Sequence, residues 1–137
     1  MDWLRSYIDN TYRVWLAEYI IATAVDVAGD LQQGWAPFDL LTPERIRVEV
    51  KASAYIQSWN QKKLSTPSFS IRRAHAWDPD SNAFSPGPGR YSDVYVFCLH
   101  HHQDQSTIDP LNLDQWTFLN AATSLIDQLG DQKTAGR

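Results

Sequence analysis

The chain has 137 residues, of which 43% are hydrophobic, and this is enough to build one domain around one core. Six tryptophans, six tyrosines and five phenylalanines exclude extended disorder, because disordered segments are poor in large apolar side chains. The formal net charge of -4 gives no overall attraction to nucleic acid, so DNA binding would need a local basic patch or metal ions. We therefore expect a single domain over residues 1–137.

The N-terminal sequence and the cysteine content favour the cytoplasm. The sequence MDWLRSYIDN mixes charges of both signs and lacks the continuous apolar region of a signal peptide. The longest apolar stretch, YIIATAVDVA, is too short and too interrupted to cross a bilayer. The single cysteine, Cys98, lies in the apolar run VYVFCL, which predicts a buried, unreactive thiol. We expect a soluble cytoplasmic protein with no membrane segment.

The first predicted element is a helix over residues 12–28, where apolar side chains recur at spacings of three and four residues. Gly29 is placed to end this helix. Asn10 or Thr11 could cap its start, while Asp2 could cap a shorter first helix or an earlier start of the same one. The spacing does not decide between these starts.

Two strands, over residues 36–41 and 46–53, follow the helix. The turn signal Thr42-Pro43-Glu44 lies between them, so together they predict a hairpin. Residues 54–64 contain no glycine or proline and predict a second helix, after which residues 69–77 resume a strand.

The second half of the chain is predicted to begin with a surface loop over residues 78–90, which are rich in Pro, Gly and Ser. The apolar run 93–99 predicts a central strand that is covered on both faces. The remaining elements are a polar loop, a last strand, a short helix and a tail that is expected to fray, over residues 100–109, 115–120, 124–129 and 131–137. This order predicts one sheet flanked by helices, in the α/β or α+β class.

Candidate catalytic residues lie in the predicted hairpin. Side chains alternate between the two faces of a strand, so Glu49 and Lys51 lie on the same face. If the two strands pair, Asp39 approaches Glu49 from the side. Two convergent carboxylates repel each other unless a cation lies between them, and hard oxygen ligands favour Mg²⁺ or a similar ion. A metal that polarises a phosphoryl oxygen, beside an ammonium that stabilises the developing charge, predicts phosphodiester hydrolysis.

The same residues also have structural interpretations. An acid, any residue and a lysine occur in sequence by chance about once in every two chains of such composition, and cross-strand Glu and Lys commonly stabilise a solvated face. Glu18 is the only charged residue between Arg13 and Asp26, in an apolar segment where an unpaired buried carboxylate is costly. Glu18 therefore either has a partner or lies just off the apolar stripe and reaches water.

Together, a helical glutamate, an aspartate at the start of a hairpin, an E-x-K on the next strand and a following glutamine resemble the PD-(D/E)XK superfamily of restriction-endonuclease-like nucleases. The residues that carry the resemblance are Glu18, Asp39, Glu49, Lys51 and Gln57. The segments FDL, VEVKASAYIQSWNQ and SDVYVFCL look like an uncharacterised bacterial branch of that superfamily. The resemblance covers residues 12–99 and rests on the order of the elements. One departure is that Phe38 separates Pro37 from Asp39, so the literal Pro-Asp pair is absent.

The resemblance implies a restriction-endonuclease-like core, with a central mixed sheet flanked by helices, and hydrolysis of DNA that depends on Mg²⁺ or Mn²⁺. It implies that Asp39 and Glu49 ligate the metal, with the carbonyl of Val50 as a further ligand. Glu18 would support the metal site.

By the same resemblance, Lys51 would position or activate the attacking water, and Gln57 would join the site. The alternative is a domain of the same fold that binds DNA or a partner protein without catalysis. The chain has little room for a separate recognition domain, so specific recognition would need a homodimer or a partner protein.

Four basic residues form the predicted contact with DNA phosphates: Arg72 and Arg73, with Lys62 and Lys63 upstream. Only one of two adjacent arginines can lie on a given face of a strand. One of them could therefore serve DNA and the other a salt bridge.

Other features have simpler interpretations. The consecutive histidines 100–102 lack the spacing of a structural zinc site, which favours a solvated loop, and His75 is interpreted as structural. The sequence GPGR lacks the spacing and the ending of a phosphate-binding loop, so we expect no nucleotide cofactor. Several tryptophans could stack on bases, but their apolar neighbours favour core packing: Trp35, Trp59, Trp77 and Trp116.

Overall fold

The computed structural model describes residues 10–26, 38–73, 77–78, 80–84, 87–129 and 134–136. Its centre is a four-stranded sheet with the strand order β1-β2-β6-β7. These strands are β1 (Leu40–Leu41), β2 (Arg47–Ala54), β6 (Val94–His100) and β7 (Trp116–Ala122). β2 is parallel to β6, whereas the β1–β2 and β6–β7 pairs are antiparallel. Helices pack against this mixed sheet, so the fold belongs to the α+β class.

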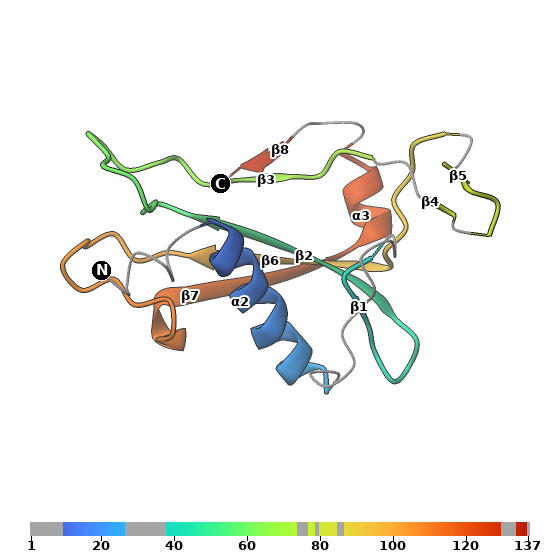
Figure 1. Cartoon of the computed structure of the whole chain (residues 1–137), viewed down its shortest axis with the longest axis horizontal. Coiled ribbons are helices and arrows are strands. Elements are labelled where there is room, and N and C mark those ends of the chain that lie inside the picture. Colours follow the sequence, from blue (N-terminus) through green and yellow to red (C-terminus); the bar gives the residue numbers. More distant parts are fainter. Residues whose placement is uncertain are drawn as a thin grey trace.

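Helix α2 (Asn10–Ala24) covers one face of the sheet (Figure 1). Ala17 and Ile21 point toward the sheet and pack against Val50 and Cys98 in the main hydrophobic core. The helix is confirmed, although it ends at Ala24 rather than at residue 28. The proposed caps at Asp2 and Gly29 lie outside the described residues.

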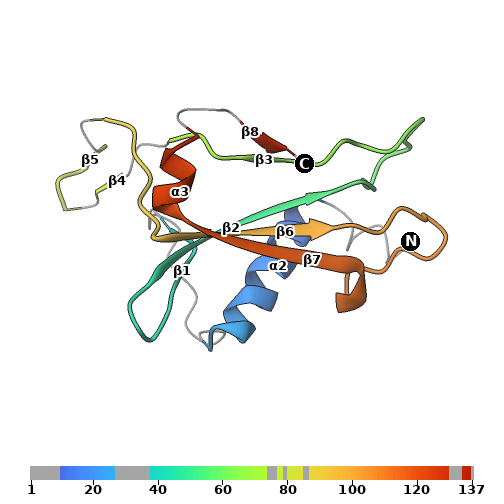
Figure 2. The same cartoon turned by 180° about the vertical axis from the view of Figure 1, so that it is seen from behind.

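The opposite face is covered by α3 (Thr123–Asp127) and by β3 (Ser68–Ser70), which pairs with β8 (Thr134–Gly136), as Figure 2 shows from behind. On this face Tyr95 packs with Ile71 and Ile126. β6 therefore has packed side chains on both faces, which confirms the central strand that its apolar run predicts.

The predicted hairpin is confirmed, because β1 and β2 are antiparallel and Leu40 lies opposite Val48. Within the turn, the Thr42 hydroxyl accepts a hydrogen bond from the Ile46 N–H at 3.0 Å. Arg45 has a φ of 67°, in the left-handed region that tight turns use. Residues 36–37 of the predicted first strand lie outside the described part of the chain.

The helix predicted over residues 54–64 is wrong. β2 continues to Ala54, and the chain then follows an irregular path. The Gln61 side chain binds backbone groups that would otherwise pair within a helix. Its Oε1 accepts from the Gln57 N–H at 2.9 Å, and its Nε2 donates to the Tyr55 carbonyl at 3.1 Å. Such side-chain bonds to the backbone compete with helix formation, and residue periodicity does not reveal them.

Three other predictions need correction. Of the strand predicted over residues 69–77, residues 69–70 lie in β3, which pairs with β8 outside the main sheet, Trp77 lies in a separate short strand, and residues 74–76 are not described. The predicted loop 78–90 includes a short antiparallel pair, β4 (Trp77–Asp78) and β5 (Ala83–Phe84). The tail over residues 131–137, which is predicted to fray, instead contains β8. The backbone of β8 pairs with β3.

His100 is not part of a solvated loop. It is the last residue of β6 and is fully buried, with its ring stacked on Trp116 at a centroid distance of 4.7 Å. Trp116 packs in the core as predicted, whereas Trp59 is 55% exposed. The last strand and the short helix correspond to β7 and α3. No helix among the described residues has the length and apolar character to span a membrane.

Candidate functional site

The Asp39 carboxylate lies against the outer edge of β2. β1 pairs with β2 only at Arg47 and Val48, so the edge beyond Val48 has no strand partner among the described residues. Asp39 takes this place, because its N–H donates to the Val48 carbonyl at 3.0 Å and its Oδ2 accepts from the Val50 N–H at 2.7 Å. The start of the hairpin thus directs an acid toward the strand that bears Glu49 and Lys51.

Asp39, Glu49 and Lys51 converge in the structure. The carboxyl groups of Asp39 and Glu49 are close enough to share a hydrogen bond. Glu49 Oε1 lies 3.6 Å from Lys51 Nζ, and its Oε2 accepts from the Ser92 hydroxyl at 3.3 Å. Residue alternation and hairpin pairing predict this grouping, and the structure contains it.

Burial and mutual repulsion change the acidity of the carboxyl pair. Burial, and then the negative charge of Asp39, raise the pKa of Glu49 to about 7, although the Lys51 charge and the Ser92 hydroxyl act in the opposite direction. Burial also raises the pKa of Asp39, and this outweighs the hydrogen bond from the Val50 N–H. Near neutral pH the pair therefore retains a proton that a bound cation would replace.

Glu18 lies on α2 within electrostatic range of Asp39. Burial raises the pKa of Glu18 to about 7, and the negative charge of Asp39 contributes in the same direction. The Glu18 side chain is partly buried, so it is neither enclosed in the core nor freely exposed to water. Among the described residues, no three His, Cys, Asp or Glu side chains are spaced to hold a metal ion. The convergent acids are thus the pair Asp39 and Glu49, with Glu18 farther away.

Gln57 does not lie in a helix, and its side chain forms hydrogen bonds with Arg13 and Ala54 rather than with Asp39 or Glu49. Its Oε1 accepts from Arg13 Nη1 at 3.4 Å, and its Nε2 donates to the Ala54 carbonyl at 3.2 Å. Arg13 is only 2% exposed, although it is a charged residue of α2. Sequence analysis did not single out Arg13. The available signal was a positively charged residue at a position that the apolar spacing of α2 assigns to the core.

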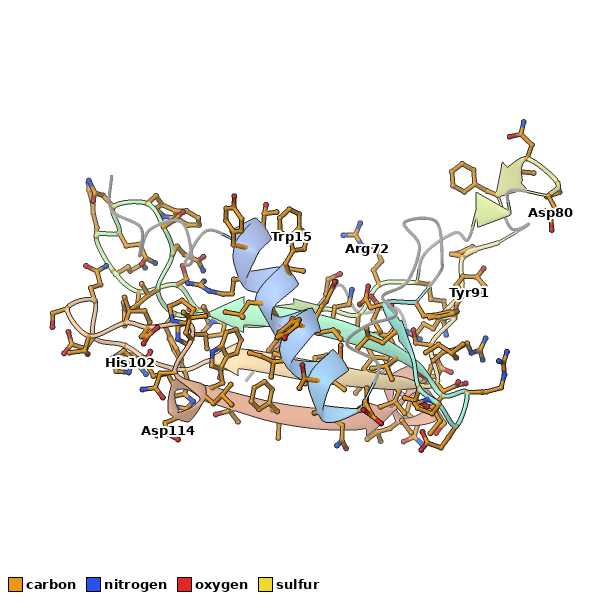
Figure 3. The ribbon with its side chains drawn as sticks, turned by 60° about the horizontal axis from the view of Figure 1, so that its bottom comes forward. Trp15, Arg72, Asp80, Tyr91, His102 and Asp114 are labelled. Carbon is orange, nitrogen blue, oxygen red and sulfur yellow. The ribbon has the colours of Figure 1, made fainter. Side chains whose placement is uncertain are left out.

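The four predicted DNA-contacting cations do not form one cluster. Figures 1 and 2 show the green loop before β3 extending to one end of the molecule, away from the segment that follows β3. Arg73 Nη2 lies 3.7 Å from Asp127 Oδ1, as expected for the arginine that serves a salt bridge. Arg72 is exposed and projects away from the ribbon in Figure 3.

Comparison with known proteins provides no relative for this chain. No family model, curated protein or solved structure matches it. A functional assignment must therefore come from the geometry of Asp39, Glu49 and Lys51.

Proposed function

We propose that the protein is a metal-dependent nuclease that hydrolyses DNA phosphodiester bonds. The observation that carries this proposal is the convergence of Asp39, Glu49 and Lys51 at one edge of β2, with the ammonium 3.6 Å from the Glu49 carboxylate. Paired carboxylates beside an ammonium provide both a cation-binding group and a positive charge for an anionic substrate.

The donor set suits Mg²⁺ or Mn²⁺. Asp39 and Glu49 offer carboxylate oxygens, and the Val50 N–H points to Asp39. The N–H and C=O of one strand residue point to the same edge, so the Val50 carbonyl faces that edge as well. Hard oxygen ligands of this kind fit a small divalent cation, which when bound would polarise a phosphoryl oxygen and lower the pKa of a water.

The chain's own groups have distinct tasks in this proposal. The Val50 N–H fixes the Asp39 carboxylate, and the Ser92 hydroxyl fixes one oxygen of Glu49. The Lys51 side chain is 30% exposed, so its ammonium can reach a phosphate or a water that approaches from solvent. Lys51 would thus orient the attacking water or stabilise the negative charge that develops on the phosphoryl oxygens.

A restriction-endonuclease-like core is the finer fold assignment within this proposal. It is supported by the order of α2, the hairpin that bears Asp39 and Glu49, and the parallel apolar strand β6. The connection between β2 and β6 departs from that pattern, because its described residues form β3, β4 and β5 but no helix. The alternative, a domain that binds DNA or a partner without cleavage, shares the same fold.

A plasmid-nicking assay with Mg²⁺ or Mn²⁺ tests the proposal. We expect Lys51→Ala to lower the rate by about a hundredfold or more, because a preorganised charge is removed from the reacting group. The matched control is Arg45→Gln, which removes a positive charge from an exposed residue in the hairpin turn that has no role in the proposed site, so it should retain wild-type activity. Equal nicking by Lys51→Ala and wild type would contradict the assignment, and DNA binding without cleavage would favour the alternative.

A further inference from the structure

β7 is an edge strand of the four-stranded sheet, and its outer edge has no strand partner among the described residues. Figure 3 shows it as the salmon strand below the yellow β6. At the two ends of β7, the Gln115 carbonyl and the Thr123 N–H bond to backbone groups that flank β6. Because backbone groups alternate in direction along a strand, the even-numbered residues from Trp116 to Ala122 direct their N–H and C=O groups outward.

This edge carries none of the features that usually prevent a strand from pairing with another chain. The sequence WTFLNAA has no charged residue, proline or glycine, and it pairs with β6 without a bulge. The other edge of the sheet differs, because there β1 pairs with β2 and the Asp39 carboxylate binds the Val50 N–H. An uncharged edge of seven residues can therefore receive a further strand.

The middle of β7 is exposed on both faces of the sheet. Phe118 lies opposite Cys98, on the side that α2 covers, and is 38% exposed. Leu119 lies opposite Phe97, on the side of α3, and is 52% exposed. Asn120 follows and is also exposed. Apolar side chains that reach solvent on both faces of an uncharged edge indicate a surface that a partner covers.

The order of side chains in β7 favours a second copy of the same strand as this partner. The large residues Trp116 and Phe118 lie in its first half, and its last two residues are alanines. In an antiparallel pair with its twofold axis at Leu119, Trp116 lies opposite the second copy's Ala122. Phe118 lies opposite Asn120 in the same register. Large side chains then face smaller ones, as close packing between neighbouring strands requires.

We infer that β7 pairs antiparallel with β7 of a second copy and joins the two sheets into one. Outward backbone groups supply about eight hydrogen bonds, and the exposed parts of Phe118 and Leu119 supply roughly 200 Å² of apolar surface per chain. A standard interface buries about 800 Å² per partner, so this edge favours a dimer of micromolar affinity rather than an obligate one. Because β1 and Asp39 occupy the other edge, assembly ends at two copies.

The pairing does not rest on the proposed nuclease function. Asp39, Glu49 and Lys51 lie at β2, which β6 separates from β7, so the dimer leaves the proposed site open. Lys51 is level with Phe97 of β6, and Phe97 is level with Leu119 at the axis. The dimer thus places the two copies of Lys51 roughly 24 Å apart across the joined sheet.

Sedimentation of the whole protein in EDTA, over a concentration series, tests the pairing. We expect wild type to shift from the mass of one chain toward that of two between about 1 and 300 μM. Leu119→Lys brings two ammonium groups together at the axis and should weaken association by about tenfold or more. The matched control is Ile46→Lys, at a 40% exposed position in the hairpin turn at the other edge, which should associate as wild type does.

Opposite charges at residue 119 test the register. Leu119→Glu alone should associate as weakly as Leu119→Lys, whereas an equimolar mixture of the two should form dimers at least as well as wild type, because unlike charges face each other. A second variant, Asn120→Pro, removes an outward N–H without breaking the pairing with β6, so it should also weaken association. Circular dichroism checks that each variant is folded.

Wild-type protein that stays a single chain at about 1 mM would overturn the inference and would leave the edge to a strand of a different protein. Association that Leu119→Lys leaves unchanged would also overturn it, because the contact would then lie elsewhere. A charged mixture that associates no better than its components, or growth beyond two copies, would contradict the twofold register. Failure of the nuclease proposal has a different signature, namely no plasmid nicking while dimers still form.

Discussion

Asp39 and Glu49 lie on opposite arms of one hairpin, and their carboxyl groups come close enough to share a hydrogen bond. Two ionised carboxylates in such contact repel each other, and burial adds to the cost of charging them. The nearby Lys51 ammonium reduces this cost without removing it, since the pKa of Glu49 is still raised to about 7. The folded chain therefore holds a proton on this carboxyl pair near neutral pH.

Binding of Mg²⁺ should release this proton. Because the pKa of Glu49 is about 7, the folded protein is protonated there at pH 6 and largely ionised at pH 8.5. We expect Mg²⁺ affinity to rise between these values, with about one proton released at pH 6 and almost none at pH 8.5. Calorimetry in buffers of different ionisation enthalpy measures the release. Equal affinity and no proton release at both pH values would contradict the prediction.

Glu49→Gln should stabilise the metal-free protein at alkaline pH. The pKa of Glu49 is raised from 4.5 to about 7, so the stability contributed by its protonated form is present below pH 4.5 and is lost as the pH rises through 7. Glutamine remains neutral throughout. We expect the variant to exceed wild type in free energy of unfolding by about 1 to 2 kcal/mol at pH 8, and by little at pH 4.

Urea unfolding in the presence of EDTA at pH 4 and pH 8 measures this difference. Glu44→Gln is the matched control, because Glu44 is exposed in the turn of the same hairpin. It should leave the free energy of unfolding almost unchanged at both pH values. A Glu49→Gln protein that is less stable than wild type at pH 8 would show that the carboxylate stabilises the fold.

Local patterns were sufficient to predict the parts of the fold that follow a simple repeat. Apolar spacing locates α2, the Thr42-Pro43-Glu44 turn locates the hairpin, and the apolar run of residues 93–99 locates β6. The approach of Asp39 to Glu49 and Lys51 follows from antiparallel pairing and alternation of side chains. These features depend on neighbours that are close in sequence.

Features that depend on particular side-chain contacts, rather than on a repeat in the sequence, could not be predicted in this way. Gln61 binds the backbone of Tyr55 and Gln57 and replaces the expected helix, although nothing in the spacing of residues 54–64 indicates it. Arg13 meets Gln57 only after folding, so their contact has no local motif. Burial of His100 likewise depends on its stacking against Trp116 of β7.

Cys98 should be unreactive in the native protein. Its side chain is fully buried between α2 and the sheet, and burial raises the pKa of the thiol to about 12. The thiolate is the reactive form, so both access and ionisation oppose modification. We expect a disulfide reagent at pH 8 to modify the native protein about a hundredfold or more slowly than the protein unfolded in guanidinium. Because Cys98 is the single cysteine, comparable rates in the two states would contradict its burial directly.

His100 should make the protein sensitive to mild acid. The pKa of His100 is lowered to about 4, chiefly by burial; the hydrogen bond with Gln115 opposes this shift, and the positive charges of Arg13, His102 and His101 add to it. Gln115 Oε1 also accepts from the Asp109 N–H, so it acts as an acceptor toward His100 Nε2 at 3.1 Å. A second proton would enter at Nδ1, which is buried and has no hydrogen-bond partner among the described residues.

A histidine in the unfolded chain takes up its proton near pH 6.5, whereas His100 in the folded protein stays neutral down to about pH 4. Its contribution to stability is therefore complete above pH 6.5 and is lost as the pH falls from 6.5 toward 4. We expect this residue to lower the free energy of unfolding by about 2 kcal/mol between pH 7.5 and pH 5. Urea unfolding at the two pH values measures the loss.

His100→Phe separates this effect from other acid-sensitive groups, because phenylalanine keeps a ring against Trp116 and cannot be protonated. The variant should be less stable than wild type at pH 7.5 by about 1 to 2 kcal/mol, since Gln115 loses a hydrogen-bond donor. Between pH 7.5 and pH 5 it should lose about 2 kcal/mol less than wild type does. If both proteins lose the same free energy over this range, protonation of His100 is not what opposes folding in acid.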